Sequence, residues 1–517
     1  AYTSMDRTIT FGDLDRLSRD FAAYLQRVAG LRKGERIALM LPNVLQYPVA
    51  ILGAFRAGLT VVNTNPMYTP RELQHQLHDS GARAILILEN FAHTLDDVLG
   101  GVDLDHIIVT GAGDLLGLPR SVIVNFALRH LRKQVPPWSL PGAVRFGDAL
   151  SKGRYENLEP CTLGHEDIAF LQYTGGTTGV SKGAVLTHRN LVANVLQAEA
   201  WLRPHFPSVE GQILVTALPL YHVFSLTANC LTFLKLGGHN LLIANPRDFA
   251  GFVKELSKHR FNFFVGVNTL FNALLHTPGF DRLDFSALRV SLGGGMAVQR
   301  AVAENWKEVT GNALTQAWGL TETSPAACIN LPGTDFNGSI GLPIPSTIIT
   351  IRDDAGRELP VGESGEICVQ GPQVMRGYWN RPDETEKVML PGAVLRTGDI
   401  GRMDERGYVF IEDRKKDMIL VSGFNVYPNE VEGVAMTNPG VLEVAAVAQP
   451  DERAGEVVVL YVVRKDPALT EQALIEHCRK ELTGYKVPKR VYFRDELPKT
   501  NVGKILRRQL RDELAAK

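Results

Sequence analysis

Residues 173–184 read Tyr-Thr-Gly-Gly-Thr-Thr-Gly-Val-Ser-Lys-Gly-Ala and form the most informative stretch of this 517-residue sequence. Glycines free backbone amides to surround oxygen atoms, while hydroxyl groups and one lysine supply further donors, so the stretch predicts a loop that holds a polyphosphate. It is not a Walker A loop, because Gly183 rather than Ser or Thr follows Lys182. A mobile hairpin loop is the alternative, but such loops rarely need these groups together. The candidate ligands are Thr174, Gly175, Gly176, Thr177, Thr178 and Lys182.

Strand and helix signals alternate through the N-terminal third of the chain. Apolar residues recur on one helical face between residues 14 and 28, and residues 36–41 and 84–88 are short apolar runs typical of buried strands. Thr-Pro-Arg-Glu at 69–72 supplies a capping hydroxyl, a first-turn proline and a reciprocal glutamate, so we expect a helix to begin there. This alternation predicts an α/β fold with parallel strands.

The pattern of apolar and turn-forming residues changes after residue 335. Short apolar segments broken by Gly, Pro and Asp indicate a small β-rich subdomain, and a basic run at 413–417 follows it. The remaining residues are enough for a small α+β domain, so we place a domain boundary near Lys416. The predicted parts are an N-terminal domain at 1–415, with α/β subdomains at 1–165 and 166–335 and a β-rich subdomain at 336–412, and a C-terminal domain at 416–517.

Composition and charge exclude several classes of protein. Hydrophobic residues make up 45% of the chain, charged residues 21%, and 55 Lys+Arg balance 56 Asp+Glu, so no nucleic-acid partner is expected. The five cysteines form no Cys-x-x-Cys pair, which predicts neither a disulfide framework nor a zinc site and favours a cytoplasmic location. No apolar run reaches the ~18 residues of a membrane span, and the first residues lack the order of a signal peptide.

Four further motifs follow the predicted polyphosphate loop. The stretch 173–184 resembles the phosphate loop of the adenylate-forming enzymes, a superfamily of acyl-CoA synthetases, firefly luciferases and peptide-synthetase adenylation domains. Trp-Gly-Leu-Thr-Glu-Thr at 318–323 resembles its adenine-and-magnesium motif, and Arg-Thr-Gly-Asp at 396–399 its ribose motif. Residues 413–426 resemble its hinge motif, and 498–504 the segment that bears its C-terminal catalytic lysine. Five motifs in this order are far more specific than any one of them.

Three more segments narrow the resemblance. Residues 218–222, 421–428 and 484–488 are similar to bacterial long-chain fatty acid–CoA ligases, and the similarity runs nearly end to end. It implies a large N-terminal α/β domain, a small β-barrel-like subdomain and a mobile α+β C-terminal domain. It also implies a ligase that converts a fatty acid and ATP into acyl-AMP and pyrophosphate, then transfers the acyl group to coenzyme A. An acyl-AMP ligase that loads a carrier protein, and a CoA ligase for medium-chain or aryl acids, are the open alternatives.

The resemblance assigns residues to a nucleotide site. Lys182 and the loop hydroxyls are expected to hold the β- and γ-phosphates, Thr321 to donate to the α-phosphate, and Glu322 to bind Mg²⁺. Asp399 can accept from both ribose hydroxyls, because a carboxylate has two oxygens, and Arg414 should reinforce the ribose or phosphate end. The other expected nucleotide-site residues are Gly294, Gly295, Gln316, Ala317, Trp318 and Gly319.

Catalysis and thiol transfer involve a second group of residues. The resemblance makes Lys504 the cation that stabilises the pentavalent transition state. Lys504 must leave before pantetheine enters, which implies domain alternation about a hinge at Lys416. Ser422 and Gly423 are expected to lie on the path of pantetheine, because a glycine lets the arm pass close to the backbone. His222 is expected to orient the carboxylate or gate the acyl tunnel, unless it is a structural histidine.

Several features depart from the family pattern. Trp318 stands where tyrosine is common, which keeps a stacking face but replaces a hydroxyl with an indole N–H. Residues 292–296 contain one glycine more than usual, and the segment before Arg396 lacks the expected tryptophan. Relatives usually have further residues before the point where this sequence starts, so we expect a truncated or engineered N-terminus.

The sequence favours an apolar substrate acid. Amino-acid-activating relatives place an aspartate in the segment that matches 218–228, to pair with the substrate ammonium, and this segment has no acidic residue. The apolar residues after it are expected to wall an alkyl tunnel or, equally, to form a core strand. They are Phe261, Phe263, Phe264, Val265, Val267 and Leu270.

Residues 118–138 combine apolar and basic side chains. This composition suits an amphipathic helix at a membrane surface, and an ordinary surface helix that packs on its own domain fits at least as well. Peripheral association with the inner membrane therefore stays open, as does a homodimer. The apolar members are Val122, Ile123, Phe126, Leu128 and Leu131, and the basic members are Arg129, Arg132 and Lys133.

Overall fold

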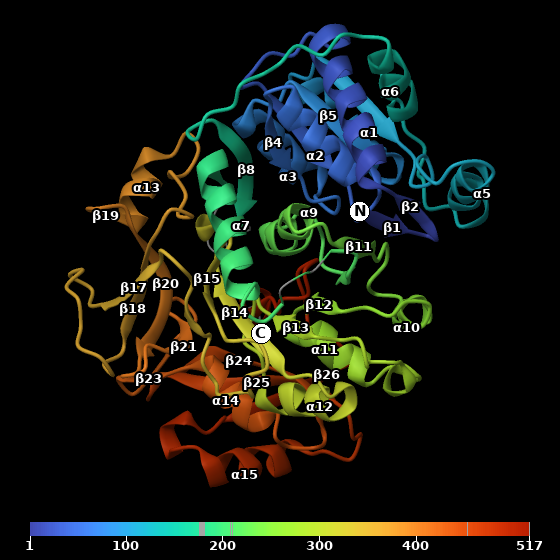
Figure 1. Cartoon of the computed structure of the whole chain (residues 1–517). Coiled ribbons are helices and arrows are strands. Elements are labelled where there is room, and N and C mark those ends of the chain that lie inside the picture. The colour runs from blue at the N-terminus through green and yellow to red at the C-terminus, as the bar shows by residue number, and fades with distance from the viewer. Residues whose placement is uncertain (175–180, 207, 209, 452, 516–517) are drawn as a thin grey trace.

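The computed structural model describes residues 1–174, 181–206, 208, 210–451 and 453–515 (Figure 1). Two large sheets with their helices make up most of the molecule. A smaller antiparallel sheet lies beside them, and the C-terminal elements lie below the second large sheet in the view of Figure 1. Within the described ranges, no helix combines the length and apolar character needed to cross a membrane.

The first large sheet is parallel except at one edge. Its order is β7 (Val144–Arg145), β6 (His106–Thr110), β5 (Ala84–Leu88), β3 (Arg36–Met40), β4 (Thr60–Asn63), β8 (Ile168–Thr174) and β9 (Lys182–Thr187). Among the described strands of this sheet, β9 alone runs antiparallel to its neighbour. The strands expected at 36–41 and 84–88 are confirmed as β3 and β5, and all of β5 is buried. The sequence therefore predicted the centre of this sheet correctly.

Helices cover both faces of the first sheet. One face carries α1 (Phe11–Ala23), α2 (Gln46–Arg56) and α6 (Phe146–Arg154), and the other carries α3 (Pro70–Ser80) and α4 (Ala92–Asp96). Alternate residues of β3 serve the two cores, as the pleat of a strand requires: Leu39 packs with the first group, Met40 with the second. The expected helix start is confirmed, since Thr69 Oγ1 accepts from Glu72 N and Glu72 Oε2 accepts from Thr69 N.

Nine strands of the described chain form the second large sheet. Its order is β16 (Leu342–Pro343), β15 (Ala326–Ile329), β14 (Leu314–Gly319), β13 (Val290–Gly293), β12 (Phe263–Gly266), β10 (Ile213–Thr216), β11 (His239–Leu242), β1 (Tyr2–Ser4) and β2 (Arg7–Ile9). Strands from β14 to β1 are parallel, and β15, β16 and β2 are antiparallel edges. The two sheets exchange strands across the predicted subdomain boundary at residue 165. Parallel pairing of β8 with β4 adds β8 and β9 to the first sheet, and pairing of β1 with β11 adds the first residues to the second.

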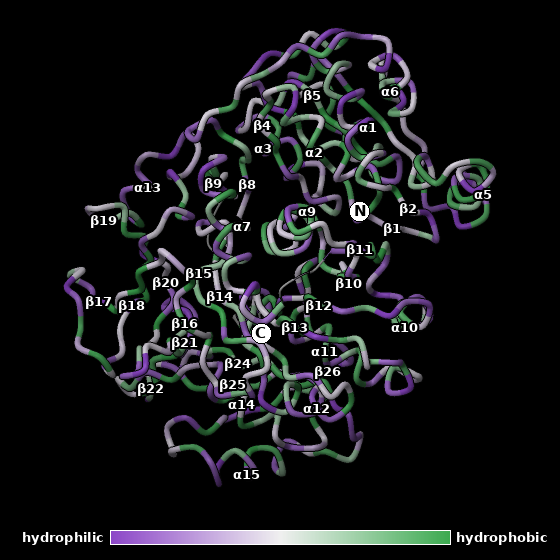
Figure 2. Tube along the Cα trace, viewed as in Figure 1, coloured by the Kyte–Doolittle hydropathy of each residue, from purple (hydrophilic) through white to green (hydrophobic). Residues whose placement is uncertain are grey.

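Helices of the second sheet surround an aromatic core. Those that supply buried core residues are α8 (Val223–Ser225), α9 (Thr232–Lys235), α10 (Phe249–Leu256), α11 (Asn268–Leu275) and α12 (Arg300–Thr310). The neighbouring elements α7 (His188–Leu202) and the π-helix η5 (Leu226–Leu231) contact α9. Trp306 is fully buried: its indole N–H donates to Ser291 Oγ at 2.8 Å, and its ring centre lies 4.6 Å from that of Phe271. Figure 2 shows the hydrophobic segments inside the molecule and hydrophilic ones along its outer loops.

Two smaller sheets complete the fold. The first is antiparallel, with β17 (Ile348–Arg352), β18 (Gly365–Gln370), β19 (Met389–Leu390), β20 (Val394–Met403) and β21 (Val409–Arg414), and carries α13 (Pro382–Val388). The C-terminal sheet contains β22 (Ile419–Val421), β23 (Phe424–Val426), β24 (Val441–Asp451), β25 (Gly455–Arg464) and β26 (Arg490–Arg494), with α14 (Pro428–Ala435), α15 (Glu471–Glu481) and α16 (Arg507–Ala515). It has its own apolar core, which includes Val431, Leu460 and Leu474.

Candidate active site

Two adjoining cavities lie where the second sheet meets α7 and the C-terminal elements. The inner cavity measures about 900 Å³ and is lined by residues of β8, α7, β12 and β14, among others. The interdomain cavity measures about 1040 Å³ and lies between the second sheet and the C-terminal elements. Residues that line both are Gly295, Ala317, Trp318, Gly319, Arg414, Lys416 and Lys504. The two cavities therefore share a wall at the end of β14.

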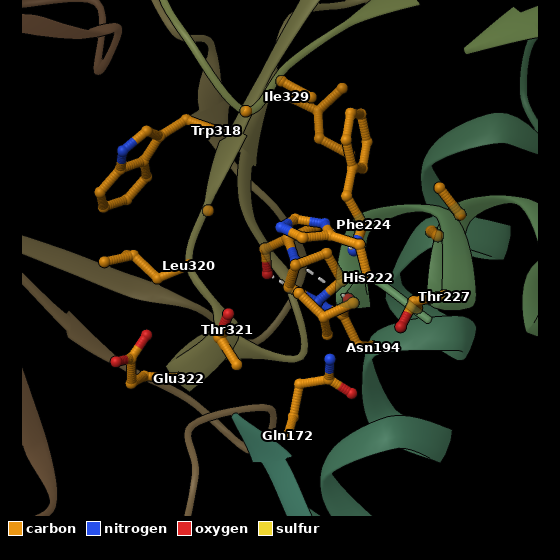
Figure 3. Close-up of a pocket in the computed structure, with 18 of the residues that line it drawn as sticks. Gln172, Asn194, His222, Phe224, Thr227, Trp318, Leu320, Thr321, Glu322 and Ile329 are labelled. Atoms are coloured by element: carbon orange, nitrogen blue, oxygen red, sulfur yellow. Dashed lines mark hydrogen bonds between the residues drawn. The ribbon is translucent and has the colours of Figure 1, made fainter. Parts of the chain in front are cut away.

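The motif at 318–323 runs along this shared wall (Figure 3). Strand β14 ends at Gly319, and the single 3₁₀ turn η7 (Thr321–Thr323) follows. A side chain at Gly319 is excluded, because its Cβ would lie 1.8 Å from Pro325 O. Leu320 N donates to that same oxygen at 3.1 Å, which closes the turn. The tight turn holds Thr321 and Glu322 at the wall of the inner cavity.

A cation and two carboxylates meet at one end of the inner cavity. Tyr378 Oη donates to Glu322 Oε1 at 2.7 Å, and burial together with the charge of Glu322 raises the pKa of Tyr378. Lys182 Nζ lies 4.9 Å from the centre of the Tyr378 ring and forms an ion pair with Glu384 on α13. The hydrogen bond from Lys182, followed by one from Lys387, lowers the pKa of Glu384 to about 2. Glu384 is therefore ionised, and it forms an ion pair with the ammonium group of Lys182.

Asp399 on β20 is a buried carboxylate with one oxygen left for a ligand. Trp318 Nε1 donates to Asp399 Oδ2 at 2.9 Å. Arg414 Nε lies 3.0 Å from Asp399 Oδ1, yet Oδ1 accepts no hydrogen bond of good geometry from the described residues. We regard the Arg414 contact as an ion pair without a directed hydrogen bond. Because buried acceptors are normally satisfied, Oδ1 at the edge of the interdomain cavity suits a ligand hydroxyl.

Lys504 is carried to the cavities by a docked C-terminal loop. Thr269 Oγ1 donates to Gly503 O at 3.0 Å, and Asn501 Nδ2 donates to Asn65 Oδ1 at 3.1 Å. Gly503 has a φ of +84°, and a Cβ there would lie 2.8 Å from Thr269 Oγ1. Glycine is therefore required for the loop to approach α11 this closely. The preceding glycine thus fixes where Lys504 enters the site.

The ammonium group of Lys504 is enclosed, although part of the residue remains accessible. Burial is the main cause that lowers its pKa to about 8; the charge of Arg414 also lowers it, while Asp399 and Glu322 raise it. His222 is enclosed as well, and burial, then the charge of Lys504, lowers its pKa to about 3. His222 Nδ1 accepts from Phe224 N at 3.3 Å and so caps α8. His222 is therefore a neutral imidazole that senses the charge of Lys504. Figure 3 shows His222 beside Phe224 in the inner cavity.

The rest of the inner cavity is largely apolar and is walled by α7 and the second sheet. Phe263, Phe264 and Val265 line it, whereas Phe261, Val267 and Leu270 do not and are buried in the core between β12 and its helices. The tunnel prediction is thus wrong for the last three residues. Sequence reasoning missed the α7 wall, whose only signal was helical spacing. The missed α7 residues are Asn194, Ala198, Trp201 and Leu202.

Comparison with known proteins identifies the family. Residues 1–379 match the AMP-binding enzyme family, and residues 430–504 match the AMP-binding enzyme C-terminal domain. The chain belongs to the AMP-binding enzyme family. This AMP-binding enzyme is 57% identical to a long-chain-fatty-acid–CoA ligase of Escherichia coli O6:H1, over 100% of this chain and 92% of the relative. It is 38% identical to a long-chain-fatty-acid–CoA ligase of Bacillus subtilis, over 98% and 90% of the two chains.

Solved structures resemble this AMP-binding enzyme over its whole length. The anthranilate CoA ligase AuaEII in complex with anthranoyl-AMP aligns with a TM-score of 0.88 and 26% identity, covering 100% of this chain and 94% of the other. ATP-bound MatB from Rhodopseudomonas palustris aligns with a TM-score of 0.83 and 27% identity, covering 99% and 95%. The adenylate-forming fold expected from the sequence is confirmed.

The AMP-binding enzyme brings most of the predicted site residues together. Thr174, Lys182, His222, Thr321 and Glu322 line the inner cavity, Gln316 and Asp399 line the interdomain cavity, and Gly295, Ala317, Trp318, Gly319, Arg414 and Lys504 line both. Gly294 lies just behind, since a Cβ there would be 2.9 Å from Ala317 O. Ser422 and Gly423 line neither cavity and lie on an exposed hairpin. Gly175, Gly176, Thr177 and Thr178 fall outside the described residues.

Proposed function

We propose that this enzyme is a long-chain fatty acid–CoA ligase. It joins a fatty acid to AMP, with release of pyrophosphate, and then transfers the acyl group to coenzyme A. The observation that carries the proposal is the continuity of the site: an enclosed lysine and a buried carboxylate share a wall with a cavity that is otherwise largely apolar. The full-length similarity to long-chain-fatty-acid–CoA ligases supports the same function.

ATP binds with its ribose at Asp399 and its phosphates toward Lys182. Oδ1 of Asp399, which accepts no directed hydrogen bond from the described residues, accepts from a ribose hydroxyl, while Trp318 holds the other oxygen and the Arg414 cation lies beside Oδ1. The segments at 294–295 and 316–319 supply the walls around the adenine. Lys182, now paired with Glu384, turns to the β- and γ-phosphates, because a polyphosphate carries more charge than one carboxylate.

Glu322 is suited to bind Mg²⁺ as one of its ligands. It is a carboxylate at the cavity wall on the same side as Lys182, and Mg²⁺ is commonly bound by one or two carboxylates together with substrate phosphates. Among the residues that the structure describes, no three His, Cys, Asp or Glu side chains converge as a metal site, so the phosphates must supply most ligands. When bound, Mg²⁺ offsets phosphate charge.

Lys504 stabilises the first half-reaction. A carboxylate oxygen of the fatty acid attacks the α-phosphorus, a P–O bond to the bridging oxygen breaks, and pyrophosphate leaves with that electron pair. Negative charge gathers on the α-phosphate oxygens, where the enclosed ammonium group of Lys504 and the hydroxyl of Thr321 can offset it. Neutral His222, which lies near Lys504, orients the incoming carboxylate as a hydrogen-bond donor.

The second half-reaction requires rearrangement of the C-terminal domain. Lys504 lines both cavities, where we infer that the thiol must enter, whereas Ser422 and Gly423 stand on an exposed hairpin and line neither cavity. Rotation of residues 416–517 about Lys416, relative to 1–415, withdraws Lys504 and brings the hairpin to the site. The thiolate of coenzyme A then attacks the acyl carbon, and AMP leaves.

One assay tests this function. Pyrophosphate, AMP and acyl-CoA are measured with ATP, magnesium, coenzyme A and acids from acetate to oleate. We expect long-chain acids to react best, and Lys504→Ala to lose the adenylation step with every acid. Lys480→Ala, an exposed lysine of α15, serves as the matched control and should retain activity. Adenylate formation without acyl-CoA would favour a carrier-protein ligase, and full activity of Lys504→Ala would refute the role of Lys504.

A further inference from the structure

An exposed apolar surface lies on α5 (Arg120–Phe126), on the π-helical turn η4 (Ala127–Leu131) that continues it, and on Leu118 just before α5. Of the seventeen large apolar side chains exposed in the described chain, five fall within residues 118–131. Scattered exposed apolar residues are normal, but such a cluster marks an interaction site. These five residues, 55–84% exposed, are named the α5 surface: Leu118, Val122, Ile123, Phe126 and Leu131.

The helix is anchored to the protein mainly by polar contacts. Asn125 Nδ2 donates to Asp114 Oδ1, and Asn125 Oδ1 accepts from Gly113 N, both at 2.8 Å. Arg129 Nη2 donates to the buried carboxylate of Glu89 at 2.5 Å. Of the α5 residues, Val124 packs against the core of the first sheet. A surface helix normally buries its apolar face and exposes its polar face. In α5 the polar side chains contact the protein, and the apolar side chains face outward.

Cations rim the α5 surface. Arg132 and Lys133 are exposed at its C-terminal end, and Arg120 at its start. Arg120 Nη1 donates to Asp6 O at 2.9 Å, which places the turn between β1 and β2 beside α5 (Figure 1). Neighbouring carboxylates are themselves paired: Asp6 with Lys258 at 3.1 Å, and Glu89 with arginines. The rim therefore presents positive charge around an apolar centre.

We propose that the α5 surface binds anionic phospholipid membranes. The apolar side chains enter the boundary between headgroups and acyl chains, while the rim cations contact lipid phosphates, as in other interfacial amphipathic helices. A second copy of the chain fits less well, because a symmetric contact brings the same cations together. A standard protein interface also needs roughly 20–30 residues on each side. This surface goes beyond the proposed function, since binding needs no catalysis.

Vesicle flotation of the full chain tests the proposal. Vesicles of equal parts phosphatidylglycerol and phosphatidylcholine should carry the enzyme, and pure phosphatidylcholine vesicles should carry it much less. Ile123→Ser with Phe126→Ser should weaken binding about 10-fold or more on the mixed vesicles. Arg132→Gln with Lys133→Gln should weaken it about 30-fold there and leave binding to pure phosphatidylcholine unchanged.

A matched pair elsewhere controls for exposed apolar area. Val192 and Leu196 on α7 are 55% and 47% exposed, and Val192→Ser with Leu196→Ser should float like the unchanged enzyme. Circular dichroism and thermal melting confirm that each variant folds. Three results overturn the proposal: no flotation of the unchanged enzyme with anionic vesicles, equal flotation of the α5 variants, or light scattering that shows these variants dissociating a dimer.

Discussion

The nucleotide end and the acyl end of the active site are built differently. At the nucleotide end, single polar groups from separate elements converge. Several are held by directed contacts, as Asp399 is by Trp318 and the Lys504 loop by Thr269. At the acyl end, α7 and β12 mainly supply apolar shape. The polar atoms of its wall bond to the protein itself, as Asn194 Nδ2 donates to Ala326 O at 2.9 Å and Trp201 Nε1 donates to Asn330 O at 3.2 Å. Hydrogen bonds depend steeply on geometry, whereas apolar burial depends on area. Changes at the first end should therefore affect all acids alike, and changes at the second should discriminate between acids.

Asp399→Asn should give the largest effect and affect every acid equally. The variant loses the charge that strengthens hydrogen bonds to the ribose, and each such bond is worth ~1.5–3 kcal/mol. Because the charge is lost both at Oδ1, toward the ribose hydroxyl, and at Oδ2, toward Trp318, kcat/KM for ATP should fall by about 100-fold or more. Pyrophosphate release is measured with a short and a long acid. Asp335→Asn, at an exposed position, is the control. A loss of activity confined to long acids would contradict the claim that the nucleotide end does not sense chain length.

Ala198→Phe should not affect all acids equally; it should lower activity with long acids more than with short ones. Ala198 lines the inner cavity from α7, and a phenyl ring there takes the room of about four methylene groups. At ~0.8 kcal/mol for each buried methylene, kcat/KM for palmitate should fall about 100-fold, with little change for butyrate. Ala200→Phe, on an exposed position of the same helix, provides the control. Equal losses for both acids would show that the ring disturbs the nucleotide end instead.

The nucleotide end could be predicted from the sequence because its chemistry is local. Glu322 follows a turn that needs Gly319, and Lys504 follows Gly503, so residue type and spacing carry the information. Asp399 could be assigned only by motif, because nothing local shows that Trp318 reaches it. For the nucleotide end, turn residues and charged residues were therefore better predictors than the periodicity of apolar residues.

The acyl end and the sheet boundaries could not be predicted in the same way. Asn194, Ala198 and Trp201 have the spacing of any helical face, which does not distinguish a cavity wall from a core. Phe261 is the same residue type as Phe263 and Phe264, which line the cavity, but it packs in the core. The exchange of strands between the sheets depends on the non-local pairing of β1 with β11, which local patterns do not encode.

Trp318→Phe should weaken ATP binding by about 20-fold. It keeps an aromatic face and removes the N–H that donates to Asp399 Oδ2, a hydrogen bond to a charged group worth ~1.5–3 kcal/mol. The measurement is KM for ATP, which should rise equally with short and long acids. In an Asp399→Asn background the same change should cost less, because the two residues act through one contact. Fully additive effects would show that Trp318 acts independently of Asp399.

Alkaline pH should slow adenylation about 10-fold at one unit above the Lys504 pKa of about 8, because the proposed role needs the charged ammonium. Stability should respond in the opposite sense. The pKa of Lys504 is lowered from 10.5, so between pH 8 and 10.5 the unfolded chain binds more protons, and this group's contribution to folding rises with pH. Falling activity with undiminished thermal stability therefore identifies titration rather than unfolding. Lys504→Arg should remove the alkaline limb, whatever residual rate it retains.

Glu384→Gln should give the smallest effect and improve nucleotide binding. Glu384 is ionised at working pH, since Lys182 lowers its pKa to about 2, and it competes with phosphates for that lysine. Ion pairs between partly exposed side chains are weak, so KM for ATP should fall by about two- to five-fold, and inhibition by pyrophosphate should strengthen by a similar factor. Glu386→Gln, an exposed glutamate of α13, is the control. Weaker ATP binding would instead mean that Glu384 positions Lys182 for phosphate. An equal change with short and long acids would place this contact, like Asp399, at the end of the site that does not sense chain length.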